Sequence, residues 1–480
     1  MRPKFNVLQD GWIPVVDTYG RREKLGIRDT LARAHELRAV EDASPLVEYS
    51  VYRFLSVFLM DALRPEELDT LEEILEYGQF DMGRIDEYIA LCQSEGVSFN
   101  LFDEQRPFMQ TAYDAAIDRE PKPVTTLNCE LPTGNSHTHF DHRAPASVSF
   151  LPDQAMRQLL TALIFCTAAA QGYPSGVYAS PLLFEIVQGE NLFETLVYTL
   201  IPTESIAMPF DDPPVLWRSK CAVSPKKEVT STSWLRGMLF PTRRILLVPN
   251  ESGNVPKVYY SQGENYVNKE VWRDPFATYR ISEDGIVPLR PHREMPIWRN
   301  LNEIIDIPGN QASRVLSQYR RLNPSDHAVL TLYGVETNQA SYLGEMRCNL
   351  RLPMEICADS THVDWVEKCI GDAETLARAT KKALVSSGAV PETICADAVK
   401  AFSESAGAEL LSLCESAAER APEALPALHD EWVGIMAKTA ARQYDRTTAS
   451  LHLRGRALAA AASARKILTQ SIHKLKEGVA

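Results

Sequence analysis

The sequence predicts an α+β fold, in which a large, irregular mixed N-terminal domain is followed by an all-α four-helix bundle. Two observations lead to this class. Alternating runs, helical periods and turn-rich stretches mix throughout residues 1–355. Alanine, leucine and glutamate then dominate residues 361–480, where glycine is rare. A chain of 480 residues is long for one compact core, and its size alone suggests two or three domains. The change in composition favours two, joined by a linker at 352–360.

The first elements follow from changes in the spacing of apolar residues. Residues 5–16 alternate apolar and polar side chains before Tyr19 and Gly20, a pattern that predicts a short hairpin. From residue 27 to about 91 the period becomes helical. One broad helical face carries Val47, Val51, Phe54, Leu55 and Phe58. Residues 61–90 hold ten acids and two bases, which indicates a solvated pair of helices.

The middle of the chain is less regular. Residues 100–150 are rich in Pro, Asn, Thr and His, and they predict mostly loop. A helical pattern runs over 153–170 and stops at the glycine-containing segment 171–176. The apolar run at 244–248 predicts a strand.

The C-terminal region divides into four helical segments. Breaks fall near residues 386–388, 420–422 and 447–448. Short connections between long helices favour antiparallel neighbours, and hence an up-down bundle. On the last segment, four apolar residues are expected to face the bundle core: Leu458, Leu468, Ile472 and Leu475.

Charge and cysteine usage narrow the classes of function. The formal net charge of −13 argues against a free-standing nucleic-acid binder, because polyphosphate repels acidic surfaces. Residues 431–480, however, hold nine bases and three acids, so any such contact is expected to be local. The nine cysteines form no CxxC pair, and we expect neither a disulfide framework nor a zinc ribbon.

No segment predicts a membrane association. A run of about eighteen apolar residues is missing, and the first residues lack the apolar core of a secretory signal. We therefore expect a cytoplasmic protein with no cofactor.

One motif suggests a metal site. Residues 137–142 spell HxHxDH, a pattern similar to the metal-binding signature of metallo-β-lactamase-type hydrolases. That family needs another histidine several tens of residues downstream, but the next one is His292. The motif also follows a polar segment in place of an apolar strand. A polar loop is the favoured interpretation, and a metal-dependent hydrolase is the alternative. No phosphate loop, GxSxG elbow or HExxH helix is present, so we expect no enzyme.

Five segments together resemble the CasA family, the large subunit of the type I-E CRISPR surveillance complex called Cascade. They are residues 5–15 (FNVLQDGWIPV), 107–111 (PFMQT), 134–142, 187–196 (VQGENLFETL) and 333–341 (YGVETNQAS). The resemblance runs in order from residue 5 to the end, and the predicted C-terminal bundle fits the same family.

The resemblance implies a non-catalytic subunit that acts in antiviral defence. It would recognise the protospacer-adjacent motif (PAM) in duplex DNA, help to start strand separation and recruit a nuclease-helicase. Its partners would be the backbone, small and guide-end subunits, the guide crRNA, target double-stranded DNA and the nuclease-helicase, with no membrane. A further alternative is a structural adaptor that makes no DNA contact.

The resemblance also implies which residues read the DNA. A hairpin would place Asn338 and Ala340 along the PAM in the minor groove, and Gln339 would wedge the first target pair apart. The alternative for this segment is an ordinary polar turn. A glycine loop would use Gly172, Ser175 and Gly176, although the family often has several consecutive glycines there. Lys269 is the preferred lysine finger and Lys257 the second choice.

Two further sets of residues complete the expected contacts. By resemblance, a loop near the guide-RNA end would use Asn135, His139, Phe140 and Arg143. On the last helix, Arg454, Arg465 and Lys476 recur every eleven residues, close to three helical turns. Cations aligned in this way could follow a phosphate backbone or an acidic partner. The alternative is a solvated helix face.

Overall fold

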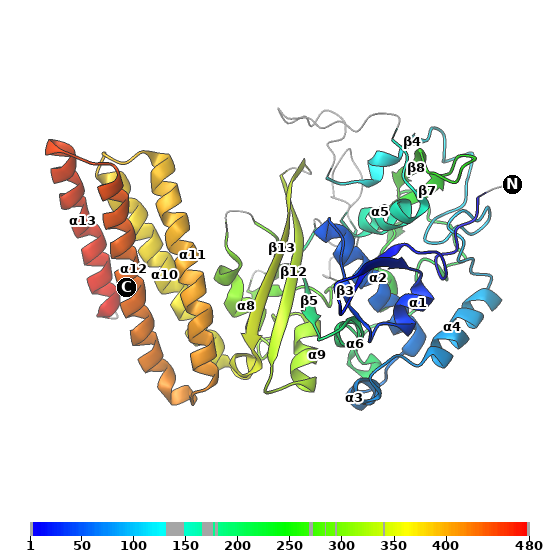
Figure 1. The fold of residues 1–480 in the computed structure, drawn as a ribbon, viewed down its shortest axis with the longest axis horizontal. Helices are drawn as coiled ribbons and strands as arrows, with labels where there is room; N and C mark the ends of the chain where they lie inside the picture. The colour runs from blue at the N-terminus through cyan, green and yellow to red at the C-terminus, as the bar shows by residue number, and fades with distance from the viewer. Residues whose placement is uncertain are drawn as a thin grey trace.

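The structure is a computed structural model that describes residues 3–130, 148–165, 176–177, 181–267, 272–283, 285–292, 295–338 and 341–477. The predicted α+β class is confirmed: small sheets mix with helices, and a helical region follows (Figure 1). Within the described ranges the strands form five sheets of two or three strands each. One of these sheets lies between the N-terminal elements and the helical region (Figure 1).

Most elements of the N-terminal part are short, and the longer ones include one helix and a pair of neighbouring strands. Its helices are α1 (Ile27–Ala32), α2 (Pro45–Leu63), α3 (Leu68–Tyr77), α4 (Met82–Ser94), α5 (Pro152–Phe165), α6 (Leu192–Tyr198), α7 (Trp234–Met238), α8 (Leu301–Ile305) and α9 (Arg314–Leu322). The strands are β1 (Ile13–Asp17), β2 (Arg22–Leu25), β3 (Leu37–Val40), β4 (Lys122–Pro123), β5 (Phe184–Gln188), β6 (Glu228–Val229), β7 (Arg243–Val248), β8 (Lys257–Gln262), β9 (Asn265–Tyr266), β10 (Tyr279–Ser282), β11 (Gly285–Pro288), β12 (His327–Asn338) and β13 (Ser341–Pro353). The 3-10 helices are η1 (Val124–Leu127), η3 (Thr203–Ser205), η4 (Ile297–Asn300), η5 (Met354–Cys357) and η6 (Pro422–Ala424).

Several predicted elements are confirmed. The hairpin is β1 paired with β2, and Gly20 takes φ +83° in its turn, although the strand begins only at Ile13. The acidic stretch forms the helix pair α3 and α4, the apolar run near 244 is β7, and α5 begins at Pro152. Residues 166–170, at the end of the predicted helix, lie outside the described residues. Strand β3 was not predicted, because its four residues interrupt a stretch with a helical period.

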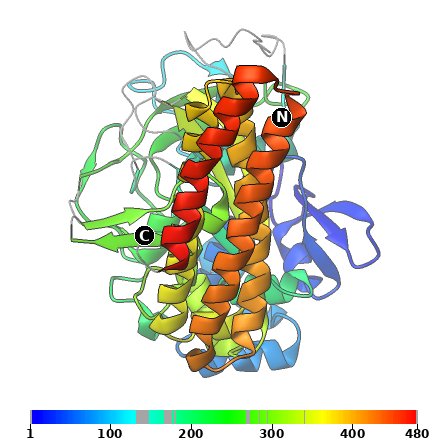
Figure 2. The ribbon, with the colours of Figure 1, turned by 90° about the vertical axis from the view of Figure 1, so that its left-hand side faces the viewer.

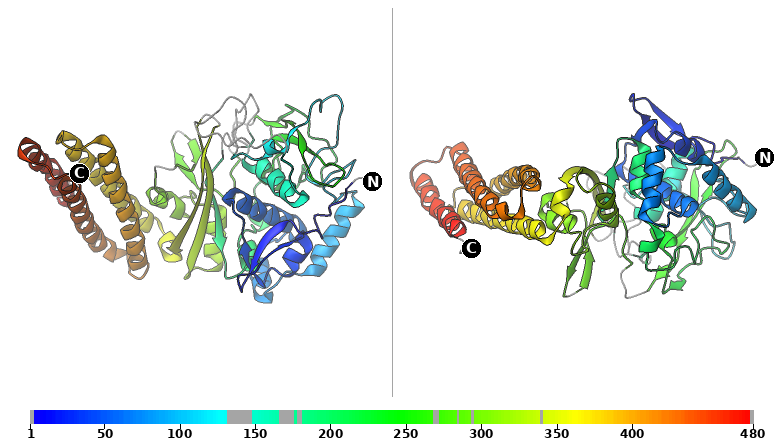
Figure 3. Two further views of the ribbon diagram at one scale, coloured as in Figure 1. Left: turned by 45° about the horizontal axis from the view of Figure 1, so that its top comes forward. Right: turned by 90° about the horizontal axis from the view of Figure 1, so that it is seen from below.

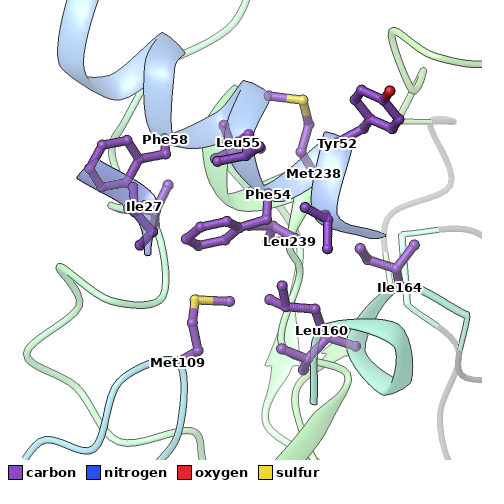
Figure 4. Packing of buried hydrophobic residues seen from close by; sticks show 14 of the residues in the cluster. Ile27, Tyr52, Phe54, Leu55, Phe58, Met109, Leu160, Ile164, Met238 and Leu239 are labelled. Carbon is purple, nitrogen blue, oxygen red and sulfur yellow. The ribbon is translucent and has the colours of Figure 1, made fainter. Parts of the chain in front are cut away.

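Helix α2 is the centre of the N-terminal core. The predicted apolar face is buried, and so is the rest of the helix from Leu46 to Asp61. Phe54 and Leu55 of α2 belong to one buried cluster with Leu160 of α5, Met238 and Leu239 (Figure 4). Tertiary packing therefore surrounds α2 completely.

A buried charge fixes α2 against the rest of this core. Arg53 is fully buried and donates to the Asp274 carboxylate at 2.6 Å and to the Met238 carbonyl at 2.6 Å. A buried cation is costly unless it is paired and hydrogen-bonded, and both conditions are met here.

Strand β12 of the sheet formed by β5, β12 and β13 contributes side chains to two cores, whereas alternate residues of β13 are exposed. Strand β12 is central and pairs antiparallel with β13 on one side and β5 on the other. Tyr333 and Val335 belong to the N-terminal core, whereas Leu330 and Leu332 belong to a second core that includes the helical region. Since successive strand residues point to opposite faces, one strand serves both cores.

Four long helices form the C-terminal bundle. They are α10 (Ser360–Ser386), α11 (Glu392–Ala418), α12 (Leu425–Ser450) and α13 (Gly455–Lys476). Helix α10 contacts the other three, which lie nearly antiparallel to their chain neighbours (Figures 2 and 3). The predicted breaks near 386–388 and 420–422 fall between these helices, but the third, at Thr447 and Thr448, was placed too early, because α12 continues to Ser450. Leu468 and Leu475 are buried as expected, but Leu458 is 55% exposed, so its expected place in the core was wrong. The division into domains 1–355 and 361–480 stays a prediction.

Five of the eight cysteines in the described ranges are buried free thiols. Among the helices described, none is long and apolar enough to cross a membrane.

Glu185 gives a test of this packing. It is fully buried in β5, accepts from the Thr278 hydroxyl at 2.5 Å, and burial raises its pKa to about 7. The folded protein therefore binds a proton that the unfolded chain releases near pH 4.5. The contribution of Glu185 to stability should be greatest below pH 5 and should be lost as the pH rises to 7, which lowers stability by up to about 3 kcal/mol.

In Glu185→Gln the share of this fall that belongs to Glu185 should be absent, so stability should fall less than in the wild type over the same pH range. Urea unfolding between pH 5.5 and 8 measures it, with Glu72→Gln on the exposed surface of α3 as the control. An unchanged pH dependence in Glu185→Gln would contradict the burial described here.

Candidate nucleic-acid interface

The most prominent candidate feature is a long antiparallel ribbon. Strands β12 and β13 pair along their whole length, from His327 opposite Pro353 to Asn338 opposite Ser341. Strand β5 pairs only with Val329–Tyr333 of β12, so the ribbon continues beyond the sheet as two strands (Figure 1). Asn338 is the last residue of β12 and therefore stands at the tip of the ribbon.

Buried polar contacts hold the ribbon on α2. The Tyr333 hydroxyl donates to Glu48 of α2 at 2.6 Å, and the guanidinium of Arg347 lies 3.2 Å from the same carboxylate. Glu48 is 3% exposed, and burial raises its pKa while Tyr333 and Arg347 oppose that shift. Gly334 lets the segment around Pro291 approach β12 closely, because a Cβ at position 334 would lie 2.2 Å from the Pro291 side chain.

A second contact lies closer to the tip. The Ser44 hydroxyl, at the N-cap of α2, is 2.7 Å from Glu130 and 3.3 Å from Glu345 of β13. Desolvation and the neighbouring Glu130 charge raise the pKa of Glu345 to about 7. The ribbon is thus tied to α2 at its N-cap and again at Glu48, which orients its tip.

Most of the predicted DNA-reading residues cannot be placed beside this tip. Gln339, Ala340, Gly172, Ser175 and Lys269 lie outside the described residues, and so does the side chain of Asn338. Two of the predicted positions are described, Gly176 and Lys257, and both lie near strands β7 and β8. A Cβ at Gly176 would lie 2.6 Å from Thr242, and the second-choice lysine, Lys257, is exposed at the start of β8.

The guide-end loop also falls outside the described ranges. This applies to Asn135, His139, Phe140 and Arg143, and to the whole HxHxDH segment. Among the residues that the structure does describe, no cluster of His, Cys, Asp or Glu could hold a metal ion.

The three cations predicted on the last helix differ in their surroundings. Arg465 makes a two-pronged ion pair with Asp445 of α12, at 2.7 and 3.0 Å, and lies over the Tyr444 ring. Arg454 is exposed at the N-cap of α13, and Lys476 is exposed in its last turn. Arg465 therefore ties α13 to α12, while the other two face solvent.

A row of cations on α12 was not anticipated from the sequence. Lys438, Arg442 and Arg446 are four residues apart, and none of them is buried. This spacing places them on one helix face at steps of about 6 Å. The spacing is visible in the sequence, but the bases of residues 431–480 were counted together, so this row was not separated from the others. We call these three residues the α12 basic row.

The fold is that of known CRISPR-associated proteins. It superposes on Thermobifida fusca Cse1 with a TM-score of 0.80 at 19% identity, covering 98% of each chain. Thermus thermophilus CasA (Cse1) gives a TM-score of 0.78 at 22% identity over 98% of this chain and 99% of that one. A chain of a CRISPR RNA-guided surveillance complex gives 0.76 at 19% identity, over 98% and 100% of the two chains.

Sequence comparison identifies the family within this class. The model of the family described as CRISPR-associated protein Cse1 (CRISPR_cse1) matches residues 6–455. The CRISPR-associated protein CasA/Cse1 of Thermus thermophilus is 28% identical over 404 residues, which cover 79% of this chain and 76% of that protein. The chain belongs to the Cse1 family, and the resemblance to CasA is confirmed.

Removing one hydroxyl tests how the ribbon is held. Tyr333→Phe takes from the buried Glu48 carboxylate its 2.6 Å hydrogen bond and leaves only Arg347 beside it. The free energy of unfolding, measured with urea, should fall by about 1–3 kcal/mol. Tyr77→Phe, at an exposed tyrosine on α3, should change it by less than about 0.5 kcal/mol. Equal stability of the two variants would show that this contact does not hold the ribbon.

Proposed function

We propose that this chain is the non-catalytic large subunit of a type I-E CRISPR Cascade surveillance complex. Membership of the Cse1 family supports this proposal, as does the similarity to a chain of a CRISPR RNA-guided surveillance complex. The observation that carries the proposal is the anchored ribbon, which presents Asn338 at its tip. In this role the chain takes part in antiviral defence, and we expect it to act in the cytoplasm.

The ribbon tip would recognise the PAM from the minor groove. That groove presents few distinguishing groups, so recognition there depends on small, closely fitting residues. Asn338 and Ala340 would lie along the PAM, and Gln339 would separate the first target pair. Exchange of a DNA duplex for an RNA–DNA hybrid is nearly balanced in free energy. Disruption of a single base-pair step can therefore start the exchange. A wedge must resist the duplex, and the contacts of Tyr333, Arg347 and Glu345 with neighbouring side chains supply that resistance.

The distribution of charge fits a subunit that depends on partners for part of its DNA affinity. The chain carries a net charge of −13, yet residues 431–480 contain nine bases and three acids. The α12 basic row, together with Arg454 and Lys476, would contact a phosphate backbone locally. The backbone, small and guide-end subunits, with the crRNA, would hold the target. The large subunit would then present the opened DNA to the nuclease-helicase.

Substitution of the tip tests the proposal in the assembled complex. Gln339→Ala should slow strand opening, and replacing residues 338–340 by glycines should weaken preference for the correct PAM by about tenfold, since one base contact is worth about 1–3 kcal/mol. Binding and strand opening are measured on a library of duplexes that differ only at the PAM. Val329→Thr, at the opposite end of the same strand, is the control.

The structural-adaptor alternative predicts a different result in the same experiment. A structural adaptor with no DNA contact would show unchanged PAM preference and strand opening in the glycine variant. That outcome would overturn the proposal.

A further inference from the structure

Two arginines on neighbouring segments lack a carboxylate partner among the residues that the structure describes. Arg273 precedes β10, and Arg314 is the first residue of α9. Both are half-buried, and within the described ranges neither forms an ion pair. Burial lowers the pKa of both guanidinium groups, and the charge of Arg273 lowers the pKa of Arg314 further. Two like charges are therefore held near each other in a partly dehydrated place.

Both guanidinium groups are fixed in position. Arg273 lies 4.9 Å from the Tyr279 ring centroid and donates to the Asn310 carbonyl at 2.6 Å. Arg314 lies 5.1 Å from the Trp234 ring centroid and donates to the Ser205 carbonyl at 2.9 Å. A guanidinium carries five N–H donors, so most donors of each group remain available for a ligand. The two fixed side chains are preorganised, because stacking on a ring limits their conformational freedom.

The backbone holds the two segments together. Val315 donates to the Pro275 carbonyl at 3.2 Å, and Tyr279 donates to the Gln311 carbonyl at 2.8 Å. These hydrogen bonds join the chain around Arg273 to the start of α9. The positive end of the α9 dipole lies at Arg314 and adds to the positive potential there.

The neighbouring carboxylates are engaged elsewhere. Asp274 follows Arg273 directly, but it accepts from the buried Arg53 at 2.6 Å and from the amide of Phe276 at 2.9 Å. Glu185 is fully buried and accepts from Thr278. The charge of the two arginines is thus not neutralised by either acid, and an anion from outside the chain would remove their mutual repulsion.

From this arrangement we infer that Arg273 and Arg314 form a binding site for one phosphate group of a nucleic-acid backbone. The inference rests on the proposed function, in which the chain meets both guide RNA and target DNA. Arginine forks match the geometry of phosphate oxygens, and phosphate contacts set the register of a protein on nucleic acid without reading sequence. The site would position the strand, and the ribbon tip would read it.

The test uses the full chain and two probes, inorganic phosphate and a short labelled oligothymidylate. The variant is the double substitution Arg273→Gln and Arg314→Gln, which removes both charges. Arg321→Gln, at an exposed arginine on the same helix, is the matched control. Phosphate should raise the thermal midpoint of the wild type and of the control relative to chloride at equal ionic strength, and should leave the double variant unchanged.

The oligonucleotide arm identifies the source of the phosphate. Affinity should fall about tenfold in the double variant, and the slope of log K against log salt should become shallower by about 0.7, the share of one single-strand phosphate contact. A methylphosphonate analogue, which lacks the backbone charge, should bind the wild type and the double variant equally weakly. If phosphate stabilises the wild type but the double variant keeps its oligonucleotide affinity, the nucleic-acid assignment is overturned. If neither probe distinguishes the double variant from Arg321→Gln, there is no anion site.

Unfolding of the double variant would not prevent the test. The single variants Arg273→Gln and Arg314→Gln, and the pair Arg273→Lys with Arg314→Lys, then serve in the same assays. The lysine pair should keep the wild-type slope of log K against log salt, because it retains both charges. It should lose affinity, because an ammonium group lacks the paired N–H donors of a guanidinium. These readouts use the full chain alone, so their failure is distinguishable from a failure of PAM recognition, which is measured in the assembled complex.

Discussion

The fold depends on one strand, β12, which contributes side chains to two separate cores. Side chains along β12 point alternately to the two faces of the sheet. Tyr333 and Val335 lie in the N-terminal core, and Leu330 and Leu332 lie in the core shared with the bundle. A slip of one residue in register would exchange these faces and place each side chain in the wrong core. The ribbon that continues from this sheet therefore has its register and direction set at the base (Figure 1).

A two-stranded ribbon alone is only marginally stable in water, so its extension beyond β5 needs other contacts. The buried hydrogen bond from Tyr333 to Glu48 and the Arg347 guanidinium fix the ribbon to α2 at the last pair that adjoins β5, and Ser44 with Glu345 supplies a contact beyond that pair. Such polar contacts inside a protein add little net stability, but they favour one arrangement over its competitors. The proposed wedge at the tip would require this specificity.

The sequence was most informative where local pattern and tertiary structure agree. The four helices of the bundle, the acidic helix pair and β7 were predicted because their periods extend over whole elements. Strand β3 was missed because four residues carry too little pattern to interrupt a helical stretch. The complete burial of α2 could not be predicted, since its polar residues, among them Arg53 and Glu48, find partners on segments distant in sequence. The same reason hid the pair formed by Arg273 and Arg314, and the Asp445 partner of Arg465.

Amide hydrogen exchange along the ribbon tests the central claim most directly. The claim is that the outer ribbon is held as firmly as its base. In the full chain, the amides near the pair Glu336 and Gly344 should exchange slowly, at rates within about tenfold of those near Leu330 and Leu350. Exchange beyond Tyr333 at the rate of an unstructured chain, with protection confined to the segment paired to β5, would contradict the account.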